Sequence, residues 1–236
     1  MNKTEDISNR GWVKPTPQLY GRSNLGAPLE AWVDPKATSV ELLLFAGIHG
    51  NEPEGTMLLS KLLRTFQRVP QKCAIILAAN PDGISRGTRA NANGVDLNRN
   101  FAAQNWSPKE LYYHWNRDTE EREMILKTGE KPGSEPETQA LAKLISTLKP
   151  KHTIAVHGPL DCVDDPESSV LGKWLSEKSN MPLVVDIGYP VPGSFGSWCK
   201  EQNYHVITYE LPNQSSWEIM QVHLPIFEEL LHRYTE

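Results

Sequence analysis

The first candidate for chemistry is an imidazole and a carboxylate three positions apart, at His49 and Glu52. They follow the apolar run 40–45, and Gly47 and Gly50 allow the backbone to leave a strand for a loop there. Zinc binds nitrogen and oxygen donors of this kind, and catalytic zinc sites keep one position open for water. Taken alone, the pair fits equally well an ordinary strand-end histidine beside a solvated loop charge.

Two further side chains lie at the ends of apolar runs. His157 follows the run 152–156 and precedes a glycine, as His49 does, and none of the other five of the seven histidines has this setting. His157 is therefore the candidate third metal ligand. Glu210 follows the apolar run 205–209, where burying a carboxylate is costly unless the site uses it.

The segment 80–106 is long, has little periodicity and is rich in Gly, Asn, Asp and Pro. Loops of this length inside a compact domain are usually functional. This one carries a dense group of polar side chains: Arg86, Arg89, Asp96, Asn98, Arg99 and Asn100. The planar guanidinium of Arg99 can bind a carboxylate through two hydrogen bonds, and Asp96 could orient a metal-bound histidine. The arginines could equally be surface charges.

The segments between these residues alternate between strand and helix patterns. Strands are expected at 29–33, 40–45, 73–79, 152–156, 183–187 and 205–209. Helices are expected after Pro53, after a capping box at Ser134–Glu137, over 116–127 and 171–179, and after a capping box at Ser215–Glu218. This order predicts one α/β domain, residues 1–236, with a mixed, mainly parallel central sheet flanked by helices, a short N-terminal hairpin and an irregular segment 1–19. Ligands then bind at the carboxyl ends of the strands.

Composition excludes several classes of protein. The net charge is −5 and the 24 Lys and Arg are scattered, so a general nucleic-acid binder is not expected. No stretch approaches the ~20 apolar residues of a membrane span. Residues 1–10 are polar and lack the apolar core of a signal peptide, and three cysteines fit a reducing compartment. We therefore expect a cytoplasmic protein, as a monomer or homodimer.

Four ordered motifs resemble the zinc metallocarboxypeptidase family over roughly residues 20–212. They are the HxxE pair at His49, GVDLNRNF at 94–101, the histidine at 157 and TYELP at 208–212. Within that family, the runs RANANGVDLNRNF, KPGSEPETQAL and PGSFGSWC are similar to those of the bacterial murein peptide amidases. That group hydrolyses the γ-D-glutamyl–meso-diaminopimelate bond of L-Ala-γ-D-Glu-meso-diaminopimelate, a cell-wall peptide that is recycled.

The resemblance implies a zinc-carboxypeptidase-like fold, a small murein peptide as substrate and one Zn²⁺ per chain. The implied zinc ligands are His49, Glu52 and His157, with Asp96 supporting His49. The implied catalytic residues are Glu210 as general base and Arg89 as oxyanion stabiliser, with Arg86 as an alternative to Arg89. The implied substrate-binding residues are Asn98 and Arg99 for the terminal carboxylate and Tyr189 as a mobile residue that closes over the substrate.

Three questions stay open at this point. Asp161, Asp164 and Asp165 follow His157 and could meet the second ammonium group of diaminopimelate, or could form an ordinary polar loop. An aspartoacylase-type zinc deacylase shares HGNE and a DLNR run, so hydrolysis of N-acyl amino acids is an alternative. A non-catalytic peptide-binding module is a third possibility, but it would be expected to lack the base or a ligand, and this chain has both.

Overall fold

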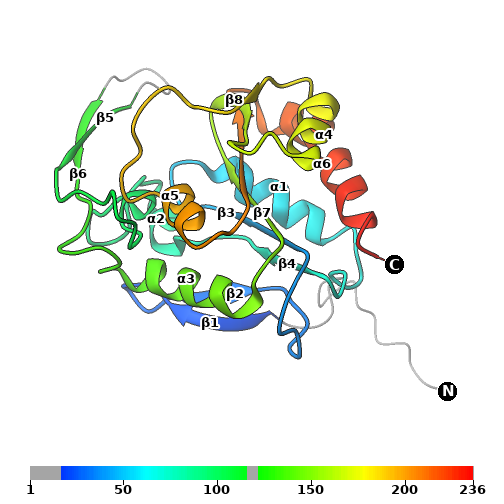
Figure 1. The fold of residues 1–236 in the computed structure, drawn as a ribbon, viewed down its shortest axis with the longest axis horizontal. Coiled ribbons are helices and arrows are strands. Elements are labelled where there is room, and N and C mark those ends of the chain that lie inside the picture. The colour runs from blue at the N-terminus through cyan, green and yellow to red at the C-terminus, as the bar shows by residue number, and fades with distance from the viewer. Residues whose placement is uncertain (1–16, 116–121, 236) are drawn as a thin grey trace.

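The computed structural model describes residues 17–115 and 122–235, and its central feature is a six-stranded sheet with the order β4-β3-β7-β10-β8-β9 (Figure 1). The strands are β3 (Leu42–Ala46), β4 (Cys73–Ile76), β7 (His152–His157), β8 (Leu160–Asp164), β9 (Leu183–Val184) and β10 (Val206–Pro212). β4, β3, β7 and β10 are parallel, β8 is antiparallel to β10, and β9 is parallel to β8. The predicted mixed, mainly parallel sheet is therefore confirmed.

Helices cover both faces of this sheet. On one face lie α1 (Pro53–Leu63), α4 (Val170–Ser179) and α6 (Ser216–His232), and on the other lie α3 (Pro136–Leu148) and α5 (Phe195–Glu201). Along β3, Leu42 and Leu44 pack toward α1 and α6, whereas Leu43 and Phe45 pack toward α3 and α5. Because both faces are buried, the strand reads as a continuous apolar run without alternation.

The helix starts agree with the sequence prediction in two cases and differ in a third. α1 begins at Pro53, and the capping box of Ser215 with Glu218 opens α6. The capping box predicted at Ser134 is wrong, because α3 begins at Pro136 and its cap residue Glu135 makes no side-chain cap. The Ser134 hydroxyl instead donates to Glu135 and accepts from Asn100, which removes it from the helix end.

Two internal segments differ from the sequence prediction. The predicted loop 80–106 contains α2 (Pro81–Arg86), which is capped by the Asn80 side chain and ends at Gly87 with a left-handed φ of 65°, and a short 3₁₀ turn, η2 (Leu97–Arg99). The helix predicted over 116–127 is wrong at its C-terminal part, where β6 (Arg122–Leu126) pairs with β5 (Leu111–Trp115). Residues 116–121 lie outside the described residues.

The N-terminal hairpin is formed by β1 (Gln18–Arg22) and β2 (Pro28–Ala31), which pair antiparallel. The expected irregular segment 1–19 is therefore wrong at residues 18–19, while residues 1–16 lie outside the described part. Trp32, just after β2, bridges to Ile75 of β4 and so attaches the hairpin to the main sheet.

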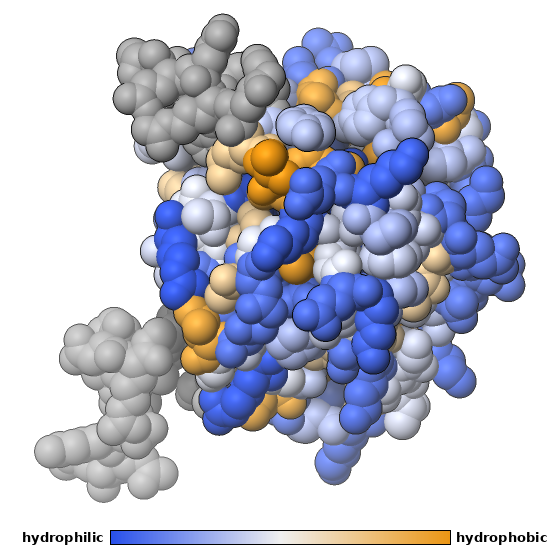
Figure 2. All heavy atoms as spheres, turned by 90° about the vertical axis from the view of Figure 1, so that its left-hand side faces the viewer, coloured by the Kyte–Doolittle hydropathy of each residue, from blue (hydrophilic) through white to orange (hydrophobic). Residues whose placement is uncertain are grey.

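The surface of the face that carries the β5–β6 hairpin is mostly hydrophilic, with hydrophobic residues in small separate groups (Figure 2). Tyr112 and Ile125, which lie opposite one another in the hairpin, are among the exposed large hydrophobic residues. Small exposed groups of this kind are normal for a globular surface. In the part of the chain that is described, no helix has the length and apolar character needed to cross a membrane.

Candidate active site and metal centre

The candidate site lies where three parallel strands end. His49 follows β3, His157 is the last residue of β7, and Glu210 lies opposite His157 in the β10–β7 pairing. Glu52 lies at the start of α1, so the short connection from β3 to α1 positions both His49 and Glu52. Parallel pairing thus brings residues from distant parts of the chain to one edge of the sheet.

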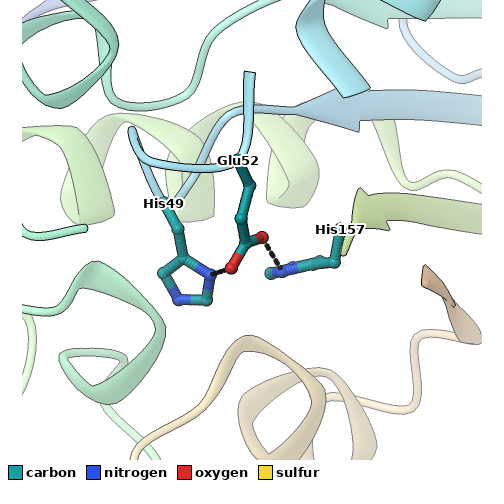
Figure 3. A group of neighbouring side chains, drawn as sticks. All are labelled: His49, Glu52 and His157. Carbon is teal, nitrogen blue, oxygen red and sulfur yellow. Dashed lines mark hydrogen bonds and ion pairs between the residues drawn. The ribbon is translucent and has the colours of Figure 1, made fainter. Parts of the chain in front are cut away.

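The carboxylate of Glu52 lies between two imidazole rings (Figure 3). Glu52 Oε1 is 2.9 Å from His49 Nδ1, and Glu52 Oε2 is 3.1 Å from His157 Nδ1. One ligand atom from each of the three residues lies within 4.8 Å of the others, and all three residues are buried. Burial raises the pKa of Glu52, but the two histidines outweigh it and hold the pKa well below its usual range.

These donors fit zinc. Two imidazole nitrogens and one carboxylate converge on one buried point, which is a donor set that zinc takes in catalytic sites with a further position open. Among the described residues, no other group of three or more such side chains meets this condition. The sequence prediction of these three ligands therefore has the geometry that it requires.

Asp96 and Arg89 form a second layer around this group. Asp96 Oδ1 is 3.2 Å from His49 Nε2, the ring nitrogen that faces away from Glu52. Arg89 Nε donates to Asp96 Oδ2 and Arg89 Nη1 donates to Glu52 Oε1, both at 3.0 Å. Burial raises the pKa of Asp96, but Arg89 and His49 hold it well below its usual range. Such a partner fixes the orientation of a metal-binding imidazole.

The surroundings of Arg89 distinguish it from the alternative candidate Arg86, which is exposed in the last turn of α2. Arg89 packs on the ring of Tyr113, with its guanidinium carbon 4.5 Å from the ring centre. The Tyr113 hydroxyl accepts a hydrogen bond from the Asn51 side chain at 3.4 Å. Sequence analysis missed Tyr113, although the aromatic run 111–115 is typical of a strand and could have indicated β5.

Glu210 is buried and only partly hydrogen-bonded. Its carboxylate accepts from the backbone N–H of Leu160, while Oε2 has no partner among the described residues. Burial raises the pKa of Glu210 to about 7, with His157 lowering it and Glu52 raising it. A carboxyl group with a pKa near neutrality can take up a proton and return it within one reaction.

The predicted substrate-binding residues come from η2 and from the segment before α5. Asn98 Oδ1 accepts from the N–H of Phe195, the first residue of α5, and Arg99 Nη1 donates to the Asn98 carbonyl, both at 2.9 Å. Arg99 Nε is buried and has no partner among the described residues. Tyr189 is 49% exposed, and its pKa is raised by burial and by the charge of Glu210, whereas Arg99 lowers it. Tyr189 therefore lies within electrostatic range of both Glu210 and Arg99.

The three aspartates after His157 have different surroundings. Asp165 is fully buried and accepts hydrogen bonds from the N–H and hydroxyl of Ser169, so it holds the start of α4 and the prediction that it could meet substrate is wrong. Asp161 is exposed, and its charge acts on Tyr209 and His223, which pack together on the α6 side of the sheet. Asp164 is half-buried in β8.

Comparison with known proteins agrees with this geometry. Residues 20–163 match the model of the zinc carboxypeptidase family. Murein peptide amidase A of Escherichia coli K12 is 47% identical over 231 residues, covering 98% of this chain and 96% of that protein. Murein peptide amidase A of Vibrio campbellii is 44% identical and covers 92% of this chain and 87% of that one.

Solved structures show the same relationship. The crystal structure of murein-tripeptide amidase from Escherichia coli O157 superposes with a TM-score of 0.87 at 47% identity, covering 98% of each chain. Thrombin-activatable fibrinolysis inhibitor has a TM-score of 0.71 at 17% identity, covering 97% of this chain and 71% of that one, which shows a shared fold. The chain belongs to the zinc carboxypeptidase family and, within it, to the group of the murein peptide amidases.

Proposed function

We propose that this chain is a zinc-dependent amidase that hydrolyses the γ-D-glutamyl–meso-diaminopimelate bond of L-Ala-γ-D-Glu-meso-diaminopimelate and releases diaminopimelate. The observation that carries the hydrolytic part is the free Oε2 of buried Glu210, at the strand end next to the group His49, Glu52 and His157. The murein substrate is supported by the names of relatives that are 44% and 47% identical over nearly the whole chain.

In this proposal, His49, Glu52 and His157 would hold the zinc ion, which would supply Lewis-acid chemistry to a water molecule and to the amide carbonyl. Glu210 accepts the proton of the attacking water at its free oxygen and later gives that proton to the departing amine of diaminopimelate. Burial raises the pKa of this carboxyl group, which favours its holding the proton between the two transfers.

The remaining residues bind and orient the peptide. Arg89 carries the positive charge that stabilises the oxygen on which negative charge develops, and Asp96 and Tyr113 hold its guanidinium in place. Arg99, with its unpartnered Nε, pairs with the free carboxylate of the residue to be released, and Asn98 supports it. Tyr189 closes over the bound peptide and limits its contact with water.

The proposal also includes the setting of the reaction. Residues 1–236 act as one catalytic domain with one zinc ion per chain, since the described residues contain one group of this kind. The three cysteines are free and buried, which agrees with a reducing compartment. We place the reaction in the cytoplasm, where it would recycle peptides released from the cell wall.

The test uses purified, zinc-loaded protein and the tripeptide, with free diaminopimelate detected by mass spectrometry. The control is Glu210→Gln, which keeps the shape of the side chain and removes the base. We expect release by the wild type and a turnover lowered by about 10²-fold or more in the variant, the usual contribution of a general base. A zinc-loaded wild type that spares the tripeptide and hydrolyses an N-acyl amino acid would contradict the proposal and favour a deacylase.

A further inference from the structure

We propose that Asp164 is a specificity-determining residue that binds the side-chain ammonium group of the residue released from the peptide. The inference rests on the function proposed above and deepens it. Of the three aspartates that follow His157, the structure singles out this one by the strand register of β8 and by the groups around its carboxylate.

The register places Asp164 on the same face of the sheet as Glu210. In the antiparallel pair β10–β8, Glu210 lies opposite Cys162 and Thr208 lies opposite Asp164. Directly opposed residues project to the same face, and side chains alternate along a strand, so Glu210, Cys162 and Asp164 share one face. Val163 and Tyr209 occupy the other face, where they pack in the core beneath α4 and α6.

The spacing along that face suits a diamino acid. Asp164 and Glu210 are diagonal neighbours across the strand pair, about 7–8 Å apart at the backbone. Glu210 faces the amide nitrogen that becomes the first amine of diaminopimelate. Five carbon atoms separate the two nitrogens of this amino acid, a span of roughly 7 Å in an extended chain. A substrate with its reacting amide beside Glu210 can therefore place its second nitrogen near Asp164.

Within residues 17–115 and 122–235, no group competes for the carboxylate of Asp164 through a hydrogen bond. It accepts no hydrogen bond and forms no ion pair with the described residues, whereas Asp165 next to it is fully engaged with Ser169. Glu210 Oε2, itself in a residue only 6% exposed, is also unpartnered on this face of the sheet. In the proposed mechanism Glu210 Oε2 accepts the proton of water, which leaves the Asp164 carboxylate as the acceptor that a cationic, hydrogen-donating group would complete.

The charges around Asp164 are consistent with this role. Burial, Asp165 and Asp186 raise the pKa of Asp164 to about 6, whereas His157 lowers it, and the charge of Asp164 also acts on Tyr189. An ammonium group would relieve this repulsion and favour the ionised carboxylate. Arg99 carries the opposite charge and would bind the terminal carboxylate of the same residue. The substrate is thus recognised at two ends by groups of opposite sign.

The test compares two peptides that differ by one amine. One is L-Ala-γ-D-Glu-meso-diaminopimelate, and the other carries L-2-aminopimelate in its last position, which keeps the second carboxylate and lacks the second amine. We expect the wild type to prefer the diamino substrate by about 10- to 100-fold in kcat/KM, the value of a charge-assisted hydrogen bond. Asp164→Asn is expected to bring this ratio close to one, chiefly through KM for the diamino substrate.

Asp161→Asn is the matched control, because it removes the same charge three positions earlier at an exposed residue whose charge acts on the α6 side. The preference is expected to persist in this variant. Zinc content and thermal melting of both variants report whether they fold. Competition by free diaminopimelate and free 2-aminopimelate against the wild type supplies a measure that needs no variant, and we expect the diamino acid to inhibit more strongly.

The outcomes separate the two proposals. If the zinc-loaded wild type cleaves neither peptide, the proposed function fails. If it releases diaminopimelate but the preference survives in folded Asp164→Asn, or if the two free amino acids inhibit equally, the assignment of Asp164 is overturned while the amidase function stands.

Discussion

Replacing Asp96 by asparagine is expected to weaken metal binding about 10- to 100-fold, although Asp96 is not itself a ligand. Its carboxylate contacts His49 Nε2 at 3.2 Å and Arg89 Nε at 3.0 Å. Asparagine retains an oxygen for the His49 ring but has no negative charge to raise the basicity of the imidazole. Loss of such a supporting carboxylate typically costs this range of affinity, or about 1.4–2.7 kcal/mol.

The structure favours the upper end of this range. Arg89 bonds both Asp96 and Glu52, and its Nη1 lies 3.0 Å from the same Glu52 oxygen that faces His49. Without the charge of Asp96, the guanidinium keeps one carboxylate partner, which is a candidate metal ligand. Arg89 then pairs more strongly with Glu52 and competes with the metal for its carboxylate. The variant therefore weakens metal binding by two of the three ligands, His49 and Glu52.

Zinc affinity is measured by competition with a chromophoric chelator at neutral pH, and the free energy of unfolding of the metal-free protein by urea denaturation. Asp161→Asn, which removes an exposed carboxylate, serves as the control and should bind zinc as the wild type does. A folded Asp96→Asn protein with wild-type zinc affinity would refute the supporting role of Asp96.

Three further outcomes are expected. Burial lowers the pKa of His223 to about 4 from the usual 6.5, so its neutral form contributes up to about 3 kcal/mol of stability above pH 6.5 that is lost as pH falls toward 4. In His223→Gln, the free energy of unfolding measured by urea denaturation should depend less on pH across this range. An unchanged dependence on pH would contradict the assignment. Gly50→Ala should lower the free energy of unfolding by about 1–3 kcal/mol and weaken zinc binding, because a Cβ there would overlap the backbone of Gly83 in α2; a wild-type melting temperature would contradict it. Arg99→Lys should raise KM for the tripeptide about 10-fold with a smaller change in kcat, since lysine cannot bind a carboxylate through two parallel hydrogen bonds; an unchanged KM would count against the carboxylate-binding role.

The parts of the site that could be predicted from sequence share one property, their position at the end of an apolar run. His49, His157 and Glu210 each follow such a run, and parallel strands bring their carboxyl ends to a common edge. Local pattern and a general rule of topology were therefore enough to expect them together. The alternation of strand and helix patterns likewise predicted the mainly parallel sheet.

The parts that could not be predicted depend on contacts between distant segments. The strand β6 lies in a charged stretch that has the composition of a surface helix, and its pairing with β5 decides its conformation. That hairpin supplies Tyr113 beneath Arg89, a contact between residues with no local relation in the sequence. Gly50 is similar, because its need for glycine arises from the close approach of α2.

The aspartates after His157 show that sequence alone cannot distinguish the roles of neighbouring residues of the same type. The same side chain occurs three times within five positions, at Asp161, Asp164 and Asp165. From sequence alone, each of them is an equal candidate for binding the substrate. A shift of one residue in a strand moves its side chains to the opposite face, so only the pairing of β8 with β10 assigns Asp164 to the face of Glu210. Asp165, the residue after β8, instead accepts a hydrogen bond from the N–H of Ser169 at the start of α4. The proposed role of Asp164 in substrate specificity therefore depends on strand register, a property that no single stretch of the chain determines by itself.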